Sequence, residues 1–350
     1  MRSPDNKIRQ LDPDNMFGYI FDFPEQLESA MKVGQYIKLK GDVTEVRNVI
    51  IAGMGGSAIA GDVAAAIIGS KCRIPIVVIR NYSLPEWVNA SSMVICLSYS
   101  GNTEETLSCL HDAFERGATT LGITTGGQLA AELEEQDSDV VIIPDRLPPR
   151  AALGYLVVPL LSILKKYGVL NLGNEKTLTS TIDLLKTERN ILSQGNSDGH
   201  AWVLANAIHT SVPVIYGEAR TTAAVALRWR GQLEENAKMV AFHNVLPEMN
   251  HNEIVGYHNN PNLLDQLGII WLSDSSDHER NQKRRELTKS IIGNKCLYQI
   301  EVKGKGNSYM ERLFYLIHLG DWVSYWCAIL HKTNPTPVDN IVQLKKLLLE

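Results

Sequence analysis

Residues 49–57 read Val-Ile-Ile-Ala-Gly-Met-Gly-Gly-Ser, an apolar, β-branched run that ends in glycines and opens onto a helix-like stretch. The run predicts a buried strand, and the glycines permit a sharp turn into the helix, whose first N–H groups can face a phosphate. A second apolar run, Met93–Leu97, precedes Ser98–Thr103 (SYSGNT), whose hydroxyls can donate to the same oxygens. Together the two loops predict a site for a compact phosphorylated ligand.

Apolar runs alternate with helix-length segments throughout the first half of the chain. The expected strands are Val49–Ala52, Ile76–Ile79, Met93–Leu97, Thr119–Ile123 and Val140–Ile143. Runs without polar alternation suit strands that are covered on both faces, so they predict a parallel, doubly wound, flavodoxin-like sheet. Ligands bind at the carboxyl ends of such strands, and both predicted phosphate loops lie at such ends.

A second alternating region follows an apolar helix at 151–167. Its expected strands are Val212–Tyr216, Leu267–Leu272 and Leu297–Val302, and its expected helices are Thr221–Lys238, Arg280–Ile292, Tyr309–His331 and Val338–Leu349. We therefore expect an α/β protein with two domains of similar plan. These are residues 1–168 with a leading helix near 22–37, a connecting segment at 169–199 that is helical over 180–192, and residues 200–350.

Composition narrows the class of protein. The chain has 350 residues, 44% of them hydrophobic, which is enough for two cores. A net charge of −5 predicts neither a nucleic-acid nor an anionic-membrane partner. The start, MRSPDNKIRQ, lacks an apolar signal-peptide core, and no uninterrupted apolar run approaches the roughly 18 residues of a membrane span. A cytoplasmic protein is expected, with five scattered, reduced cysteines and no zinc ribbon.

The glycine loop has two other interpretations. Its G-x-G-x-x-A pattern at 53–58 formally fits the dinucleotide fingerprint. A nicotinamide site wants an acidic residue about 20 residues further on. The sequence offers Arg80 and Asn81 there, so an NADP-dependent oxidoreductase would have to use Arg80. The second interpretation is a tight turn between strand and helix that binds nothing.

The serine loop has a structural interpretation as well. Thr103 can be a plain N-cap of the helix that begins near Glu104, with Glu105 or Thr106 completing the turn. That interpretation leaves Ser98 and Ser100 unexplained, because a helix start needs only one such side chain.

Together the loops resemble the sugar isomerase (SIS) family of phosphosugar-binding domains, in which a serine-rich loop follows the third strand. The segments 149–155 (PRAALGY), 233–238 (LEENAK) and 250–253 (NHNE) look like the bifunctional phosphoglucose/phosphomannose isomerases of bacteria and archaea. The resemblance implies an aldose–ketose isomerase that links glucose 6-phosphate and mannose 6-phosphate to fructose 6-phosphate through a cis-enediol, without cofactor or metal. It places the phosphate at Gly55, Gly56, Ser57, Ser98, Ser100 and Thr103.

Isomerisation through an enediol needs a base near neutrality, which Glu235 can provide. A proton must move between C1 and C2, and a carboxylate turned into a closed cleft can have a raised pKa. Glu235 lies in a helix that also carries Arg228, Arg230, Glu234 and Lys238. A solvated face with a Glu234–Lys238 ion pair is the alternative, and the family motif favours Glu235 over its neighbour.

Arg150 and His251 complete the expected chemistry. Arg150 follows two prolines and opens an apolar helix. It is either a snorkelling surface arginine or, as the resemblance implies, the group that stabilises the enediolate. His251 is either a buried structural histidine or the group that opens the sugar ring. The resemblance implies that His251 reaches the site of the partner subunit in a homodimer. A metal site with His243 and His258 is disfavoured, since spacings of eight and seven residues fit no common ligand motif.

The C-terminal segment NPTPVDNIVQLKK supplies two further expected site residues. The resemblance places a catalytic lysine in the last helix, which gives Lys345, and a threonine upstream of it, which gives Thr336. Helix amphipathicity alone also explains a solvent-facing lysine there.

A non-catalytic phosphosugar sensor is the competing function from another class. A sensor needs the two phosphate loops but has no need of Glu235, His251 and Arg150 together. The chain also has no basic segment of the kind that binds DNA.

Overall fold

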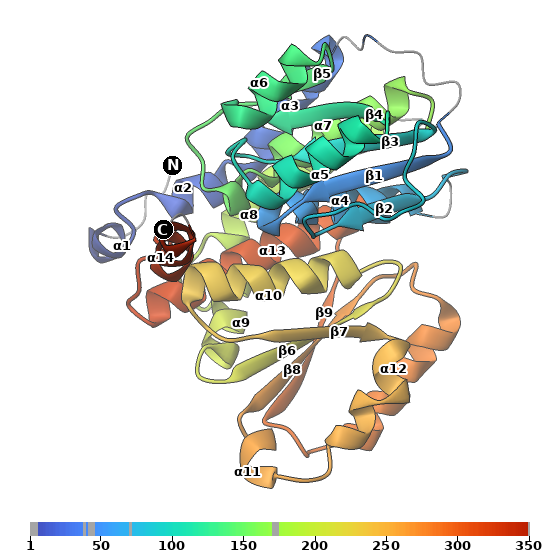
Figure 1. Ribbon diagram of the computed structural model, residues 1–350. Helices are drawn as coiled ribbons and strands as arrows, with labels where there is room; N and C mark the ends of the chain where they lie inside the picture. The colour runs from blue at the N-terminus through green and yellow to red at the C-terminus, as the bar shows by residue number, and fades with distance from the viewer. Residues whose placement is uncertain (1–5, 38–39, 41–45, 70–71, 170–174, 349–350) are drawn as a thin grey trace. The chain divides into compact units, whose positions relative to one another are not determined.

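The computed structural model describes residues 6–37, 40, 46–69, 72–169 and 175–348, and the chain divides into two compact units (Figure 1). The continuous unit is Phe23–Ile182, and the split unit combines Met1–Asp22 with Asp183–Glu350. Their boundary falls inside helix α8 (Glu175–Leu192), which fills most of the expected connecting segment. These bounds differ from the expected domains 1–168 and 200–350, chiefly because the first 22 residues belong with the second half.

The continuous unit is built on a five-stranded parallel sheet with the order β2-β1-β3-β4-β5. Its strands are β1 (Asn48–Gly53), β2 (Ile76–Ile79), β3 (Ser92–Leu97), β4 (Thr119–Thr124) and β5 (Asp139–Ile142). This flavodoxin-like order confirms the predicted fold and each predicted strand. The chain leaves β1 toward one edge and returns through β3 toward the other, so the carboxyl ends of β1 and β3 form the topological switch point.

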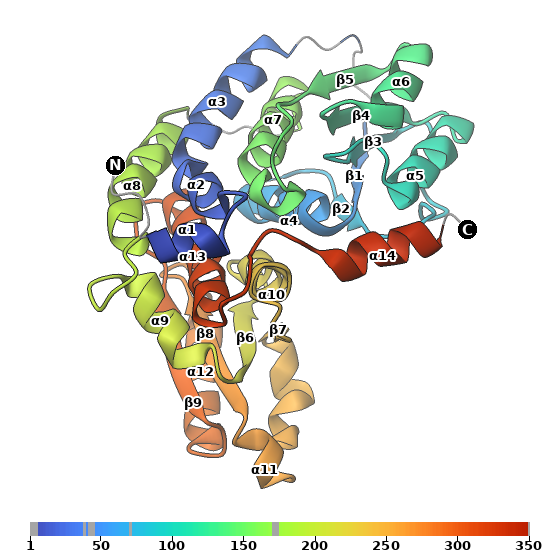
Figure 2. The same cartoon turned by 90° about the vertical axis from the view of Figure 1, so that its left-hand side faces the viewer.

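Helices cover both faces of this sheet, as Figure 2 shows. α4 (Gly55–Ile68) and α7 (Leu153–Lys166) lie on one face, and α3 (Phe23–Tyr36) packs on α7. α5 (Glu104–Glu115) and α6 (Gly127–Glu135) lie on the other face. Two layers of helices explain why β1 and β3 are almost entirely buried and apolar.

The split unit has a four-stranded parallel sheet with the order β7-β6-β8-β9. Its strands are β6 (Val212–Glu218), β7 (Phe242–Leu246), β8 (Leu267–Ser273) and β9 (Tyr298–Lys303). The order repeats that of the first four strands of the continuous unit, so the prediction of two domains of similar plan is confirmed. β7 was not predicted, because this edge strand is only partly buried and Phe242 is exposed.

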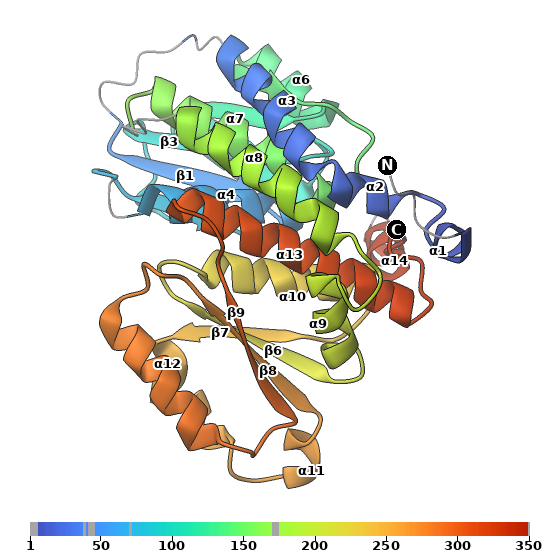
Figure 3. The same ribbon diagram turned by 180° about the vertical axis from the view of Figure 1, so that it is seen from behind.

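The split unit also has helices on both faces of its sheet (Figure 3). Besides the end of α8, the helices of this unit are α1 (Asn6–Leu11), α2 (Met16–Phe21), α9 (His200–Ile208), α10 (Ala223–Ala237), α11 (Pro261–Leu264), α12 (Glu279–Ile292), α13 (Tyr309–Leu330) and α14 (Asp339–Leu347). α10 lies over β6 and β7 and packs along α13, whereas α12 lies on the opposite face.

Helix α13 is the core helix of the split unit and holds the N-terminal segment. Phe17 of α2 packs edge-on against Trp322, Tyr325 and Trp326, with ring centroids 5.0 to 6.4 Å apart. Within the described part of the chain, α13 alone is long and apolar enough to cross a membrane, and 89% of its apolar stretch is buried inside the structure. The burial identifies it as a core helix.

Candidate active site

The glycine loop turns directly from β1 into α4. Gly55 has a φ of +48° and open space around it, a backbone conformation that side chains rarely adopt. Gly53 is required for close packing, since a Cβ there would lie 2.9 Å from the main-chain oxygen of Leu97 on the neighbouring strand. The loop therefore needs glycine at two positions for two different reasons, as expected where backbone must approach a ligand.

Arg150 lies against this loop. A Cβ on Gly56 would come within 3.2 Å of the Pro149 oxygen and 3.3 Å of the Arg150 Cα, so the start of α4 and the short helix η2 (Pro149–Ala151) are in close contact. Arg150 is only 4% exposed, which makes its interpretation as a surface arginine wrong. The side-chain amide of Gln26 fixes the turn, accepting from Gly154 N at 2.6 Å and donating to Ala151 O at 2.7 Å.

The serine loop is organised by its hydroxyls. Ser98 Oγ lies 2.9 Å from Thr103 Oγ1 and accepts the N–H of Gly101 at 3.1 Å, while Ser100 Oγ accepts the N–H of Asn102 at 3.3 Å. Thr103 occupies the N-cap position of α5, but its side chain makes no cap hydrogen bond. The interpretation of Thr103 as a plain N-cap is therefore wrong, and its hydroxyl belongs to the loop.

The next loop along the sheet supports the serine loop from behind. Gly101 has a φ of +71°, and a Cβ there would lie 1.8 Å from the Gly126 oxygen. Gly127 has a φ of +68°, and a Cβ there would lie 2.7 Å from the Ser100 oxygen. The backbones of the two loops touch, and this contact fixes the conformation of SYSGNT.

Tyr99 was missed by the sequence analysis and connects three loops. Its N–H donates to Ser57 Oγ at 3.3 Å, which joins the serine loop to the glycine loop. Its hydroxyl donates to Pro144 O at 3.0 Å and accepts the N–H of Leu147 at 3.1 Å. These bonds fix the segment that leads into η2 and Arg150. Its position between two serines was the only signal, and that does not reveal such distant partners.

The structure disfavours the interpretation of the glycine loop as a dinucleotide site. Arg80, which an NADP site would need, forms a salt bridge with Asp62 of α4. Burial raises the pKa of Asp62, and the charge of Arg80 opposes that rise. The strand order is also flavodoxin-like, whereas the dinucleotide-binding fold has the order 3-2-1-4-5-6.

Glu235 and Glu234 lie at the end of α10 in the split unit and have different surroundings. Glu235 is half-buried, whereas Glu234 is exposed and pairs with Arg230 at 3.5 Å. Lys238 does not pair with Glu234, as the solvated-face interpretation required, and instead donates to main-chain oxygens, including that of Glu235 at 2.9 Å. Burial, together with the charge of Glu235, raises the pKa of Glu234, although Arg230 lowers it.

His251 ends the short helix η3 (Glu248–His251) and is exposed, so its interpretation as a buried histidine is wrong. The loop behind it, which includes η4 (Glu253–Gly256), is anchored to the sheet. Tyr216 of β6 donates to Glu253 Oε1 at 2.5 Å and lies 2.6 Å from the Tyr257 hydroxyl. Burial raises the pKa of Tyr257 to about 12, so this hydroxyl remains a neutral partner.

Histidines near His251 form no metal cluster. Within the described residues, no three histidine, cysteine, aspartate or glutamate side chains are grouped as a metal ion would require. Burial lowers the pKa of His243, as does Arg230, while His258 is exposed.

Thr336 and Lys345 lie on the segment after α13. The N–H of Thr336 donates to Asn334 Oδ1 at 2.9 Å, and Lys238 binds the main-chain oxygens of Asn334 and Pro335. The split unit therefore brings Thr336 to the end of α10, where Glu235 lies. Lys345 is exposed in the last turn of α14, a helix without buried residues.

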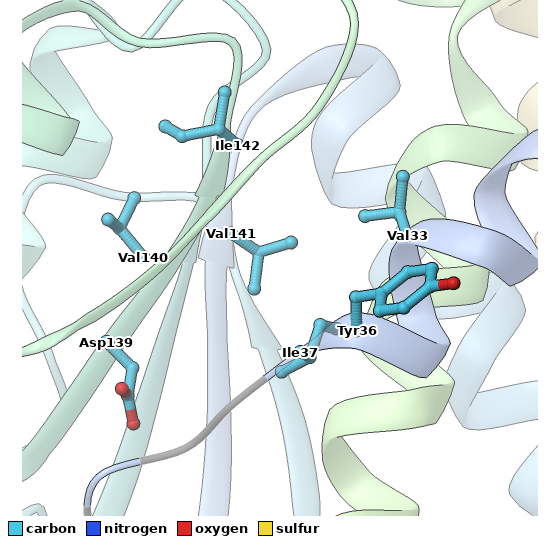
Figure 4. Close-up of a pocket in the computed structure, with 7 residues that line it drawn as sticks. All are labelled: Val33, Tyr36, Ile37, Asp139, Val140, Val141 and Ile142. Carbon is cyan, nitrogen blue, oxygen red and sulfur yellow. The ribbon is translucent and has the colours of Figure 1, made fainter.

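A pocket of about 260 Å³ in the continuous unit contains none of the predicted site residues. Figure 4 shows its lining, which comes from the end of α3 and from β5. The lining residues are Val33, Tyr36, Ile37, Asp139, Val140, Val141 and Ile142. Asp139, its charged member, is engaged by the Tyr167 hydroxyl at 3.0 Å and by the N–H of Lys40.

Comparisons with known proteins agree with this geometry. Residues 197–348 match the bacterial phospho-glucose isomerase C-terminal SIS domain. A bifunctional phosphoglucose/phosphomannose isomerase of Caldicellulosiruptor bescii is 40% identical over 96% of this chain and 99% of its own length. One from Aquifex aeolicus is 36% identical, over 88% and 92%. A hypothetical protein of Thermus thermophilus shares the fold, with a TM-score of 0.74 at 14% identity over 98% and 92% of the two chains. This chain belongs to the family of bifunctional phosphoglucose/phosphomannose isomerases.

Proposed function

We propose that this protein interconverts glucose 6-phosphate and fructose 6-phosphate, and mannose 6-phosphate and fructose 6-phosphate, through a cis-enediol. Relatives named for both activities align with nearly the whole chain. The observation that carries the proposal is the pair of loops at the switch point of the continuous unit, with buried Arg150 against the first of them. An anion-binding loop beside a buried cation suits a substrate that carries a phosphate and develops a second negative charge.

The phosphate is assigned to the glycine and serine loops. Their hydroxyl and N–H donors can surround a compact dianion, and such charge-assisted hydrogen bonds are stronger than neutral ones. The assigned positions are Gly55, Gly56, Ser57, Ser98, Ser100 and Thr103.

The isomerisation itself is assigned to side chains of known chemistry. Glu235 removes the proton from C2 of the open-chain aldose and returns it to C1, which requires a carboxylate within hydrogen-bond reach of both carbons. Arg150 stabilises the negative charge of the enediolate. His251 transfers the proton that opens the ring, Lys345 assists as a further catalytic cation, and Thr336 contacts the substrate. A proton shuttle of this kind requires no cofactor.

The proposal includes the assembly and the compartment. We expect a homodimer in which His251 of one subunit serves the site of the other, and the exposed position of His251 at the end of η3 supports this role. A cytoplasmic location is supported by the five cysteines, all of which are free thiols.

The decisive experiment compares two neighbouring glutamates. Glu235→Gln removes the base with little change of shape, so kcat should fall by about 10²- to 10⁴-fold while sugar-phosphate binding remains. Glu234→Gln is the matched control, and it should stay close to the wild type because Glu234 is exposed. Coupled assays with glucose 6-phosphate and mannose 6-phosphate, each with and without EDTA, measure both activities. Near-normal turnover by the Glu235→Gln variant would refute the assignment of Glu235.

A non-catalytic phosphosugar sensor is the alternative function. Wild-type protein that binds both sugar phosphates in calorimetry but turns over neither would establish it. An NADP-dependent oxidoreductase is less favoured, since Arg80 is paired with Asp62, and a nucleotide titration without sugar would detect it.

A further inference from the structure

Lys238 ends α10 in a conformation that lysine seldom adopts. Its φ of 55° and ψ of 31° are left-handed, a backbone geometry usually taken by glycine or asparagine at the end of a helix. This geometry turns the side chain back over the last turn of the helix. The Nζ atom then lies 2.9 Å from the main-chain oxygen of Glu235 and 3.2 Å from that of Asn236.

The same ammonium group binds a distant part of the chain. Its Nζ lies 3.0 Å from the main-chain oxygen of Asn334 and 3.1 Å from that of Pro335, almost one hundred residues further on. An ammonium group has three N–H donors, so at least one of them is shared among the four oxygens. All four acceptors are backbone carbonyls, and the two on α10 are carbonyls that a helix end leaves unsatisfied.

The bound segment leads to two proposed site residues. Asn334 fixes the turn by accepting the N–H of Thr336, and α14 with Lys345 follows. None of the residues of α14 is buried, so its own packing contributes little to its position. The bonds from Lys238 and the bond from Asn334 Nδ2 to Asp14 Oδ2 at 3.2 Å therefore restrain the point where the segment leaves the body of the unit.

We propose that Lys238 is a positioning residue, which holds Thr336 and Lys345 in register with Glu235 through the backbone of residues 334–335. The proposal rests on the proposed function, since that function makes Glu235, Thr336 and Lys345 site residues. Lys238 acts through other residues, because its ammonium donates to the main-chain oxygens of both segments. A displacement of about 1 Å in such a constellation can cost about 100-fold in rate.

The test replaces the ammonium and keeps the length of the side chain. Lys238→Met preserves the apolar stem and removes every donor. Lys332→Met is the matched control, because Lys332 also has a left-handed backbone, with a φ of 54°, and is exposed. We expect kcat/KM to fall by about 10- to 100-fold in the Lys238 variant and to remain within about 2-fold of the wild type in the control.

Two further readouts separate positioning from general damage. The inhibition constant of inorganic phosphate reports on the loops of the continuous unit, and it should stay unchanged in the Lys238→Met variant. Hydrogen–deuterium exchange of peptides covering residues 336–347 should be faster in the Lys238→Met variant than in the wild type. This measurement needs neither substrate nor an assay of activity. A rise of the phosphate inhibition constant in parallel with the loss of turnover would overturn the proposal, as would unchanged exchange.

Graded variants keep the proposal testable if Lys238→Met folds poorly. Lys238→Arg retains several donors and Lys238→Gln retains two on a shorter stem, so protection and kcat/KM should both fall in the order Lys, Arg, Gln. Absence of this order overturns the proposal. If the wild type has no isomerase activity, the proposed function fails, while the exchange data still decide whether Lys238 restrains the segment.

Discussion

The two units have the same strand order but opposite chemistry at their switch points. In the continuous unit the loops after β1 and β3 are made of glycines and hydroxyl side chains. In the split unit the corresponding positions carry carboxylates, namely Glu218 at the end of β6 and Asp274 and Asp277 in the loop after β8, each at most 5% exposed. The same topology therefore presents donors in one unit and buried acids in the other.

The carboxylate of Glu218 shows what the difference means. Glu218 Oε2 accepts the N–H groups of Arg220 at 2.8 Å and Thr221 at 2.9 Å, and Oε1 accepts the amide of Asn281 at 2.6 Å. The donors of this loop are thus satisfied by an anion that belongs to the protein itself. A topological switch point does not by itself bind a ligand. The side chains there determine whether its N–H donors bind a ligand or a carboxylate of the protein.

Ion pairs close the second loop of the split unit. Asp274 accepts two hydrogen bonds from the Arg312 guanidinium, at 2.7 and 3.0 Å, and Asp277 accepts one from Arg285 at 2.8 Å. Burial alone would raise the pKa of Asp274, but the bonds from Arg312 and Ser276 outweigh it and lower that pKa. These acids are structural, since their charges are neutralised within the unit.

The largest expected effect concerns Gly101, where the fold of the serine loop and its proposed phosphate binding depend on the same backbone contact. A Cβ there would meet the Gly126 oxygen at 1.8 Å, so Gly101→Ala combines backbone strain with a clash against main chain. We expect a loss of about 3 kcal/mol or more in unfolding free energy, and loss of phosphate binding. Gly117→Ala is the control, because Gly117 has a similar φ of +65° but room for a Cβ. This variant should lose only about 1 kcal/mol of unfolding free energy. Equal losses in urea titrations of the two variants would contradict the role of the loop contact.

The next effect tests whether protonation of a buried histidine destabilises the split unit at low pH. His318 of α13 is fully buried, and burial lowers its pKa from 6.5 to about 4. The hydrogen bond between its Nε2 and the main-chain oxygen of Ile20 raises the pKa but is outweighed by burial. The unfolded chain then binds the proton more readily, so stability is complete above pH 6.5 and falls as the pH falls toward 4. The loss is at most about 3 kcal/mol.

Tryptophan fluorescence can follow this transition selectively, since the split unit holds every tryptophan except Trp87. Urea titrations at about pH 7 and about pH 4.5 measure the loss, and His318→Gln should reduce it. The same slope with pH in wild type and variant would mean that other groups carry the acid sensitivity.

The smallest effect separates the two switch points by function. Ser98→Ala should raise KM for the sugar phosphate by about 10-fold, because it removes the charge-assisted bond that we propose between Ser98 and the phosphate. Thr221→Val is the matched change in the split unit, where the hydroxyl lies within hydrogen-bond distance of both Asp277 and Glu218 and donates its single proton to one of them at a time. It should cost about 1 kcal/mol of stability and leave KM unchanged. A rise of KM in the Thr221 variant would show that the split unit also binds substrate with its switch point.

Local sequence was sufficient for strands with unbroken apolar runs and insufficient for a strand without one. The strands of the continuous unit have such runs, and its partly buried edge strands β2 and β5 are predictable for the same reason as its buried central strands. β7 escapes that rule, since an edge strand with an exposed Phe242 and a half-buried His243 has no such run. Helix α9 was missed; it begins at His200, directly after the segment 169–199 that was interpreted as a connection.

The environment of a side chain was predictable only where it follows from local sequence. Arg150 after two prolines is unusual for a surface position, and its burial accounts for this. The sequence alone did not distinguish a surface from an interior position for it. Tyr99 and Lys238 escaped because their partners lie about 45 and 97 residues away. Contacts of that range depend on the assembled fold, and no periodicity signals them.

The path of the chain through the two units has a consequence for biosynthesis. Residues 1–22 leave the ribosome before the rest of this sequence, yet the α13 surface that receives Phe17 is made about three hundred residues later. The continuous unit can complete its sheet while the split unit still waits for its core helix. An interruption of translation after residue 182 would therefore release one finished unit attached to an N-terminal segment whose Phe17 has no α13 to pack against, a species that chaperones should recognise.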